Sequence, residues 1–157
     1  MLKVILCLLT IAALCPAQEL LTKKSLSLGV IKAMVAGAEA EALKRNVHML
    51  LTICIVDESG TLLYIQKADN AGLNTLNYCQ KKARHSAFFR SPSKNAADQL
   101  EAGKLSAMIA PNAFPNQGGL PIKVDGQTIG AIAASGAASA IDEAVAQAGI
   151  DAFFNKK

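Results

Sequence analysis

The densest group of reactive side chains lies between residues 81 and 89, where basic, imidazole and aromatic groups follow one another. Its members are Lys81, Lys82, Arg84, His85, Phe88 and Phe89. An imidazole can ligate a metal ion, Lys and Arg side chains bind anionic oxygens, and aromatic rings offer apolar surface. On a helix these groups lie within a few turns of one another. The alternative is an ordinary amphipathic helix with a surface histidine.

A pair of glycines marks the second candidate region. Gly118 and Gly119 precede Leu120-Pro121-Ile122. They either let the backbone approach a ligand closely or supply a positive φ where the chain enters a hairpin. The segment is not a phosphate loop, because it has neither the Walker lysine nor the dinucleotide-binding spacing of glycines. Ser135-Gly136 lacks the glycine pattern of a nucleophile elbow, which argues against serine hydrolysis.

The remaining candidate ligands are weaker. His48 precedes a predicted strand, where capping or exposure explains it. Tyr64 and Tyr78 carry phenols that can ligate ferric iron, although Tyr64 is better explained by packing in a hairpin. Cys54 and Cys79 either pair in an oxidising compartment or stay free and buried, and their separation is not that of a structural zinc site.

The first residues have the composition of a secretory signal. Lys3 is followed by an apolar run from Val4 to Leu14, and Cys15-Pro16-Ala17 supplies small residues before Gln18. We therefore predict a signal peptide over residues 1–17 and a secreted or periplasmic protein. A lipoprotein anchored at Cys15 and a buried N-terminal helix are the alternatives. The segment is short for a membrane span, and no later stretch replaces it.

Composition restricts the partners of the remaining chain. The formal net charge is +4, and Lys3 is the only charged residue of the predicted signal. Aromatic residues make up 4% of the sequence. A small charge with few aromatics favours no nucleic-acid groove, because such grooves need clustered cations or stacking rings. The length of residues 18–157 fits a single domain.

Periodicity predicts the first half of the domain. Apolar residues recur at helical spacing from Thr22 to about Arg45. Two apolar segments, 49–56 and 61–66, flank Asp57-Glu58-Ser59-Gly60 and predict a hairpin, since Asp, Ser and Gly favour turns. The turn explains Asp57 and Glu58 better than proton transfer does. A helix follows from about Leu73 to Phe89, and Pro92 ends it.

The second half completes an α+β domain. Ser93 is a candidate cap for a short helix toward Gly103, residues 105–110 are ambiguous between strand and helix, and residues 111–117 form a loop. Residues 118–135 predict a hairpin that turns at Asp125-Gly126. A last helix begins near Ser139, and we expect Gly149 to stop it. These elements predict an antiparallel β-sheet flanked by α-helices in one compact domain.

Four segments together resemble the GlcG/HbpS family of haem-associated proteins, which includes the C-terminal domain of PduO-type proteins. They are Val56–Leu63, Lys82–Arg84 followed by Ala87–Ser93, Gly118–Ile122, and Gly130–Gly136 with Asp142-Glu143. The resemblance implies an antiparallel sheet with helices, a homo-oligomer, and haem or a related tetrapyrrole as ligand. A haem-degrading activity is also attached to the family, but no catalytic set transfers residue by residue.

Haem needs an apolar slot, commonly an axial ligand, and often cations for its propionates. On that basis we expect His85 to ligate the iron. The other expected haem-binding residues are Lys82, Arg84, Phe88, Gly118 and Gly119. Two further hypotheses stay open: a non-enzymatic oligomeric interaction module, and an oxidative enzyme that acts on haem or a small organic ligand.

Overall fold

The computed structural model describes residue 19 and residues 22–154, so the predicted signal peptide lies outside the described residues. The elements are α1 (Leu28–Lys44), β1 (Thr52–Asp57), β2 (Leu62–Lys67), α2 (Thr75–Phe89), α3 (Ser93–Glu101), α4 (Ser106–Ile109), β3 (Gly119–Val124), β4 (Gln127–Ser135) and α5 (Ser139–Phe154). None of the helices within these residues is long and apolar enough to cross a membrane.

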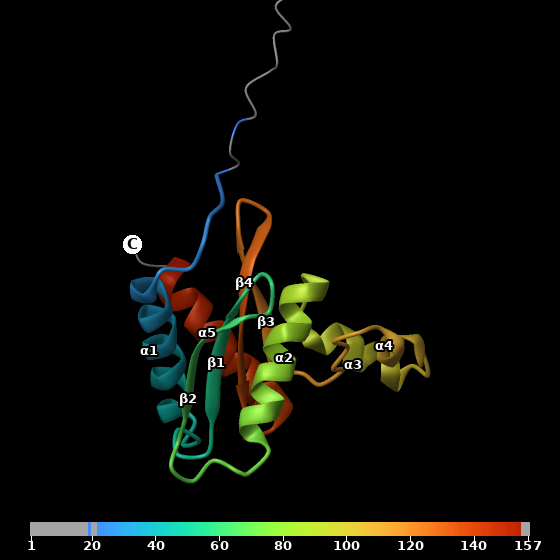
Figure 1. The fold of residues 1–157 in the computed structure, drawn as a ribbon. Coiled ribbons are helices and arrows are strands. Elements are labelled where there is room, and N and C mark those ends of the chain that lie inside the picture. The colour runs from blue at the N-terminus through green and yellow to red at the C-terminus, as the bar shows by residue number, and fades with distance from the viewer. Residues whose placement is uncertain (1–18, 20–21, 155–157) are drawn as a thin grey trace, which may run out of the picture.

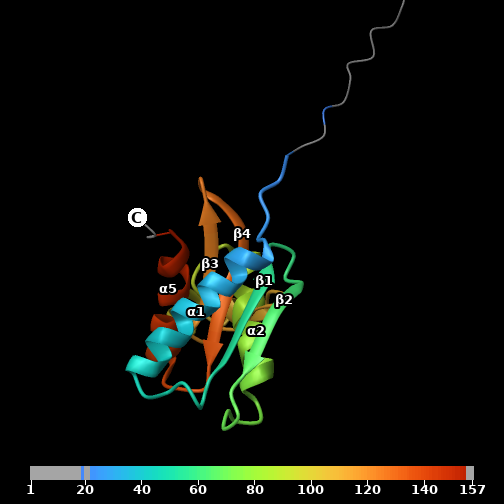
Figure 2. The same ribbon diagram turned by 90° about the vertical axis from the view of Figure 1, so that its left-hand side faces the viewer.

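The four strands form one antiparallel sheet in the order β2-β1-β4-β3. Helices α1 and α5 lie against one face and α2 lies against the other, while α3 and α4 form an arm that projects from the body (Figures 1 and 2). Both predicted hairpins are present. The fold is thus the predicted α+β domain, with helices on both faces of an antiparallel sheet.

The first hairpin turn is held by a single carboxylate. Asp57 Oδ1 accepts hydrogen bonds from the backbone N–H of Ser59 and of Thr61, at 2.8 and 2.9 Å. Burial acts to raise the pKa of Asp57, but a hydrogen bond from the Ser59 hydroxyl and the two backbone bonds together lower it. The turn role predicted for this residue is confirmed, because both neighbouring donors are satisfied within the turn.

Large aliphatic side chains fill the space between the sheet and the pair α1 and α5. The buried members include Met34, Ile55, Ile122, Ile132 and Val145. Gly149 lies in the middle of α5 where this helix crosses α1. A Cβ on Gly149 would come within 2.8 Å of the Met34 carbonyl oxygen. The prediction that Gly149 stops the helix is therefore wrong: the glycine permits close crossing, and the helix continues to Phe154.

Two other boundaries differ from the sequence prediction. The first helix begins at Leu28 and not at Thr22, because Ser27 caps it by accepting a hydrogen bond from the Val30 N–H. Ser93 starts α3 but does not cap it. Its hydroxyl instead bonds the backbone of Gly119, accepting from the N–H at 2.9 Å. The ambiguous segment 105–110 contains the short helix α4.

Candidate functional site

Small residues pack α2 closely onto its face of the sheet. The buried cluster there consists of Cys54, Val56, Cys79, Ala83, Ala87, Ala131 and Ala133. Cys54 and Cys79 are both free thiols in this cluster. Cys79 donates to the carbonyl oxygens of Thr52 and Ala133, and burial raises the pKa of its thiol. The helix therefore has little freedom to move, which fixes the direction of each side chain it carries.

Lys82 points inward from α2 and forms a buried ion pair. Its Nζ donates to Asp142 Oδ2 at 2.8 Å and to the Ala134 carbonyl oxygen at 3.2 Å. Both side chains are 2% exposed. Asp142 lies in the first turn of α5, and its Oδ1 accepts from the Ala137 N–H at 3.0 Å. Burial raises the pKa of Asp142, and Lys82 opposes this effect.

Gly118 and Gly119 bring β3 against the same lysine. Gly118 has a φ of 127°, and a Cβ there would lie 2.8 Å from Lys82 Nζ. A Cβ on Gly119 would lie 2.4 Å from the Lys82 carbonyl oxygen. Gly118 has the positive φ expected where the chain enters the hairpin, and both glycines permit a close approach to a neighbouring element. The neighbour they approach is α2 itself.

His85 lies on another side of α2 and is 2% exposed. Its Nδ1 accepts a hydrogen bond from the Phe114 N–H at 3.0 Å, and its ring lies 4.5 Å from the ring of Phe89. Burial lowers the pKa of the imidazole. Because Nδ1 accepts, the neutral ring carries its proton on Nε2. Iron ligation by His85 therefore requires release of the Phe114 bond, because Nδ1 must either bind the iron itself or take up the proton that leaves Nε2.

A small pocket of about 200 Å³ adjoins His85 between α2 and the α3–α4 arm. Asn95, Gln99 and Ser106 supply its polar groups. The imidazole therefore lies beside a pocket with polar walls.

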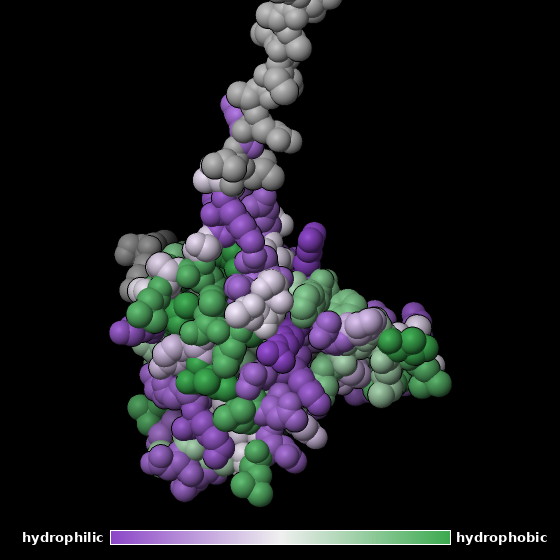
Figure 3. All heavy atoms as spheres, in the orientation of Figure 1, coloured by the Kyte–Doolittle hydropathy of each residue, from purple (hydrophilic) through white to green (hydrophobic). Residues whose placement is uncertain are grey.

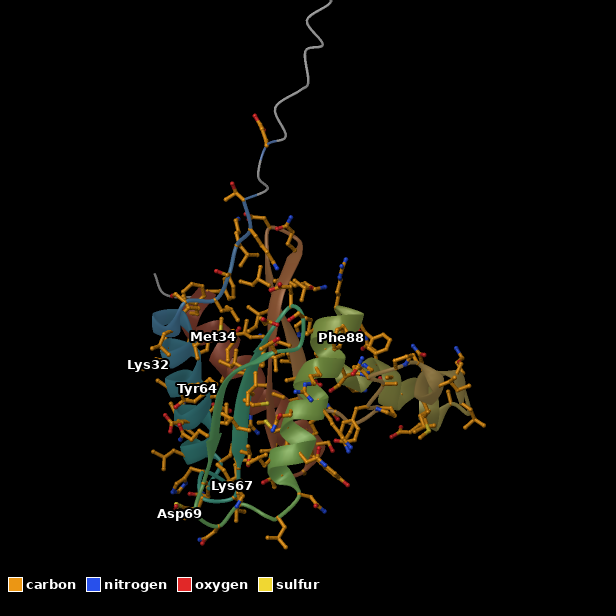
Figure 4. The ribbon with its side chains drawn as sticks, in the orientation of Figure 1. Lys32, Met34, Tyr64, Lys67, Asp69 and Phe88 are labelled. Carbon is orange, nitrogen blue, oxygen red and sulfur yellow. The ribbon has the colours of Figure 1, made fainter. Side chains whose placement is uncertain are left out.

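Arg84 and Phe88 lie at a third place, over the β1–β2 turn. Arg84 Nε donates to the Gly60 carbonyl oxygen at 3.1 Å. The Phe88 ring packs against the same glycine, which has a φ of 76°. Figure 4 places Phe88 on α2 and Met34 on the opposite, α1 side of the sheet. The structure thus joins Lys82 with Gly118 and Gly119, and Arg84 with Phe88, but separates His85 from both pairs.

Two aromatic rings pack against each other between α2 and the loop that follows α4. Tyr78 of α2 and Phe114 of the 110–117 loop meet edge to face, with ring centroids 5.3 Å apart. Lys81 Nζ lies 5.6 Å from the centroid of Phe114, within the range of a cation–π contact. Phe114 does not stand out in the sequence, because helical spacing does not extend into a loop. Its one signal is a lone aromatic within a polar, Pro-containing segment.

Cavities lie on both sides of this aromatic pair. One, of about 210 Å³, is lined by Lys81, Arg84, Asn112, Ala113 and Phe114. The other, of about 540 Å³, has Tyr78, Lys82 and Asp142 among its walls, together with Asn116, Ser135 and Ser139. We define the α2 surface as Tyr78, Lys81, Arg84, Phe88 and Phe114. It offers cations, aromatic rings and a phenol beside open space.

A bare metal ion has no ready site in the part of the chain that the structure describes. No three His, Cys, Asp or Glu side chains there come together as a ligand group. Any metal on the α2 surface would need ligands from another molecule, such as the nitrogen atoms of a macrocycle.

Comparison with known proteins gives one family and a consistent fold. Residues 26–151 match the family described as "Haem degrading protein HbpS-like". Protein GlcG of Escherichia coli K12 is 34% identical over 114 residues, which cover 73% of this chain and 84% of GlcG.

Two solved structures show the same fold. The Klebsiella pneumoniae protein ORFY superposes with a TM-score of 0.79 and 22% identity, covering 89% of this chain and 98% of ORFY. A complex of PduOC with haem superposes with a TM-score of 0.74 and 22% identity, covering 82% of this chain and 95% of PduOC.

Proposed function

This chain belongs to the HbpS-like family, and from that premise we propose that it binds haem or a related tetrapyrrole on the α2 surface. The haem complex of PduOC supports the ligand class. The observation that carries the location is the meeting of cations with aromatic rings at Lys81, Arg84 and Phe114, beside a cavity of about 210 Å³.

The donor set of the α2 surface fits this ligand. Haem presents a flat apolar ring, two carboxylates and an iron with open axial positions. Phe88 and Phe114 offer apolar area, and Lys81 and Arg84 offer charge for carboxylates. Tyr78 is 41% exposed and carries a phenol that can ligate ferric iron. When bound, haem would supply redox-active iron; the residues of this chain would hold and orient it.

Lys82 and Asp142 have a supporting part in this proposal. Because their charges compensate each other at 2.8 Å, they form a fixed polar part of the wall of the cavity that Tyr78 also lines. The pair ties α2 to the start of α5. Lys82 therefore positions α2, and the exposed cations of the α2 surface are the ones free to meet a propionate.

A haemin titration of purified protein tests the proposal. We expect a saturable change of the Soret band near one haemin per binding site. Tyr78→Phe should change the band of the ferric complex if the phenol is the ligand. His85→Ala, in turn, should change it if the predicted imidazole ligates. A linear, unsaturated change would contradict haem binding.

An oxidative activity on haem is the second candidate, supported by the family description alone. Loss of haem absorbance with a reductant and oxygen would favour it only where catalase does not suppress the loss, since free peroxide bleaches haem unaided. Persistence of the bound haem under these conditions would favour a binding protein.

Assembly into a homo-oligomer is part of the same proposal. The arm carries exposed apolar side chains at its end, visible in Figure 3: Leu105, Met108 and Ile109 are 67%, 55% and 80% exposed. Apolar patches of this kind commonly contact another chain. Light scattering should report a multiple of the chain mass, and Ile109→Lys should reduce it. An unchanged mass would exclude the arm as the contact.

Export completes the proposal. It rests on the composition of residues 1–17, which carry a lysine, an apolar run and small residues. The mass of protein recovered from cells should correspond to a chain that starts at Gln18. Recovery of the full-length chain would contradict a cleaved signal.

A further inference from the structure

A basic pocket lies at the end of the sheet where α2 finishes, away from the aromatic pair. Its volume is about 350 Å³, and its walls include Lys23, Lys24, Arg90 and Thr128. These residues come from three separate parts of the chain: the segment before α1, the residue that follows α2, and the β3–β4 hairpin. Figure 1 shows the segment before α1 running past the turn of that hairpin.

Two of the three cations are held in place by acidic partners. Lys23 pairs with Glu58 of the first hairpin turn, and Lys24 pairs with Asp125 of the second. These pairs attach the segment before α1 to both turns. The two acids compensate the two lysines, so the remaining charge at the pocket is that of Arg90.

Arg90 has no ion pair and no side-chain hydrogen bond to any residue that the structure describes. Its backbone takes the left-handed conformation, with a φ of 54°. Few residues other than glycine adopt this conformation. Here it ends α2 and leaves the guanidinium among the pocket walls, where its donors stay available.

Thr128 adds a second unused polar group. Its hydroxyl oxygen is buried and has no hydrogen-bond partner among the described residues. Thr128 pairs with Lys123 beside the register shift of the β3–β4 ladder. A buried hydroxyl without a partner carries a free-energy cost that a ligand oxygen would remove.

We propose that this basic pocket binds a small oxyanion, a phosphate or carboxylate group, through Arg90 and the Thr128 hydroxyl. A guanidinium matches two oxygens of such a group at once, and the hydroxyl donates to a third contact or to one of the same oxygens. Because Glu58 and Asp125 compensate Lys23 and Lys24, Arg90 supplies the net positive charge that attracts the anion. The site is separate from the α2 surface, so its failure leaves the haem proposal unaffected.

Isothermal titration calorimetry at low ionic strength tests the site by measuring the binding of inorganic phosphate and of succinate, with haem absent. We expect saturable binding of at least one probe, and the preferred probe distinguishes a phosphate from a carboxylate ligand. Arg90→Gln should weaken binding about tenfold, because a charge-assisted hydrogen bond is lost. Thr128→Val keeps the side-chain shape and should weaken binding about threefold or more.

Lys104→Gln is the matched control, because it removes one positive charge from the exposed α3–α4 connection. Its affinity for the probe should equal that of the unaltered protein. Absence of saturation with both probes would overturn the proposal. Equal losses in Arg90→Gln and Lys104→Gln would also overturn it, since net charge alone would then explain the binding.

Discussion

The two faces of the sheet pack against their helices through different kinds of side chain. The face under α1 and α5 is packed mainly with Ile, Leu, Met and Val side chains, and the two helices cross closely at Gly37 and Gly149. The face under α2 is packed with alanine and cysteine, and the buried polar residues Lys82, His85 and Ser86 lie on that helix. The first face contributes stability through apolar area, whereas the second places charged and aromatic groups at fixed positions.

This difference explains why the candidate site lies on one side only. Small residues let α2 approach the sheet closely, and that approach buries Lys82 far enough to require Asp142 as a partner. A wider distance between helix and sheet would leave the lysine in water, where it would not hold α2 in place. Asp142 offsets the free-energy cost of burying the lysine charge, and the pair fixes the orientation of α2. From this helix, Tyr78, Lys81 and Arg84 reach the surface.

The largest effect is expected where the buried pair is broken. Lys82→Met leaves Asp142 buried without its partner, which should reduce the free energy of unfolding by about 3–5 kcal/mol. Urea unfolding measures this loss. The double variant Lys82→Met with Asp142→Leu should recover much of it, because the unpaired charge is gone. A loss well below 1 kcal/mol in the single variant would mean that the pair does not anchor α2.

The aliphatic face provides the contrasting variant. Ile132→Ala removes a fully buried side chain and should reduce the free energy of unfolding by about 2–5 kcal/mol. Haemin affinity of the folded protein should stay unchanged, since Ile132 belongs to the cluster beneath α1 and α5. Reduced affinity in a fully folded sample would show that the two faces are not functionally separate.

A smaller effect concerns pH and the histidine on the α2 side. Burial lowers the pKa of folded His85 below its ordinary value of 6.5, so the unfolded chain binds its proton at a higher pH than the folded chain does. Stability should therefore fall as the pH drops below about 6.5, with a slope of at most about 1.4 kcal/mol per pH unit for this one proton.

Comparison with His85→Gln isolates the contribution of this histidine to the pH dependence of stability. The introduced glutamine has a side-chain oxygen that can still accept the hydrogen bond from the Phe114 N–H, and Asp142 is unchanged. The difference between the two stability profiles should therefore vanish above about pH 7 and grow below about pH 6. Parallel profiles over the whole range would show that folded His85 titrates as it does in the unfolded chain.

The sequence predicted the strands and α2 well, because alternating or helical hydrophobic patterns in those segments coincide with burial. It predicted the start of α5 but ended the helix too early, because a glycine commonly stops a helix, while the role of Gly149 depends on a crossing with α1 that only the tertiary structure provides. It also placed the start of α1 too early, since apolar spacing continues before the Ser27 cap.

The candidate site was predicted only in part. Residues 81–89 were correctly located on a helix, but neighbours in sequence point to three different places around it: Lys82 inward, Arg84 toward Gly60, and His85 toward Phe114. The Asp142 and Phe114 contacts join segments far apart in the chain, at sequence separations of 60 and 29. No local pattern contains such contacts.

Hydrogen exchange with and without haemin, at matched oligomeric state, tests most directly whether ligand binding belongs to the α2 face. We expect haemin to slow exchange in peptides that cover Thr75–Phe89 and residues 110–117, and to leave peptides of Leu28–Lys44 unchanged. Slowed exchange centred on α1, with no change along α2, would contradict this account.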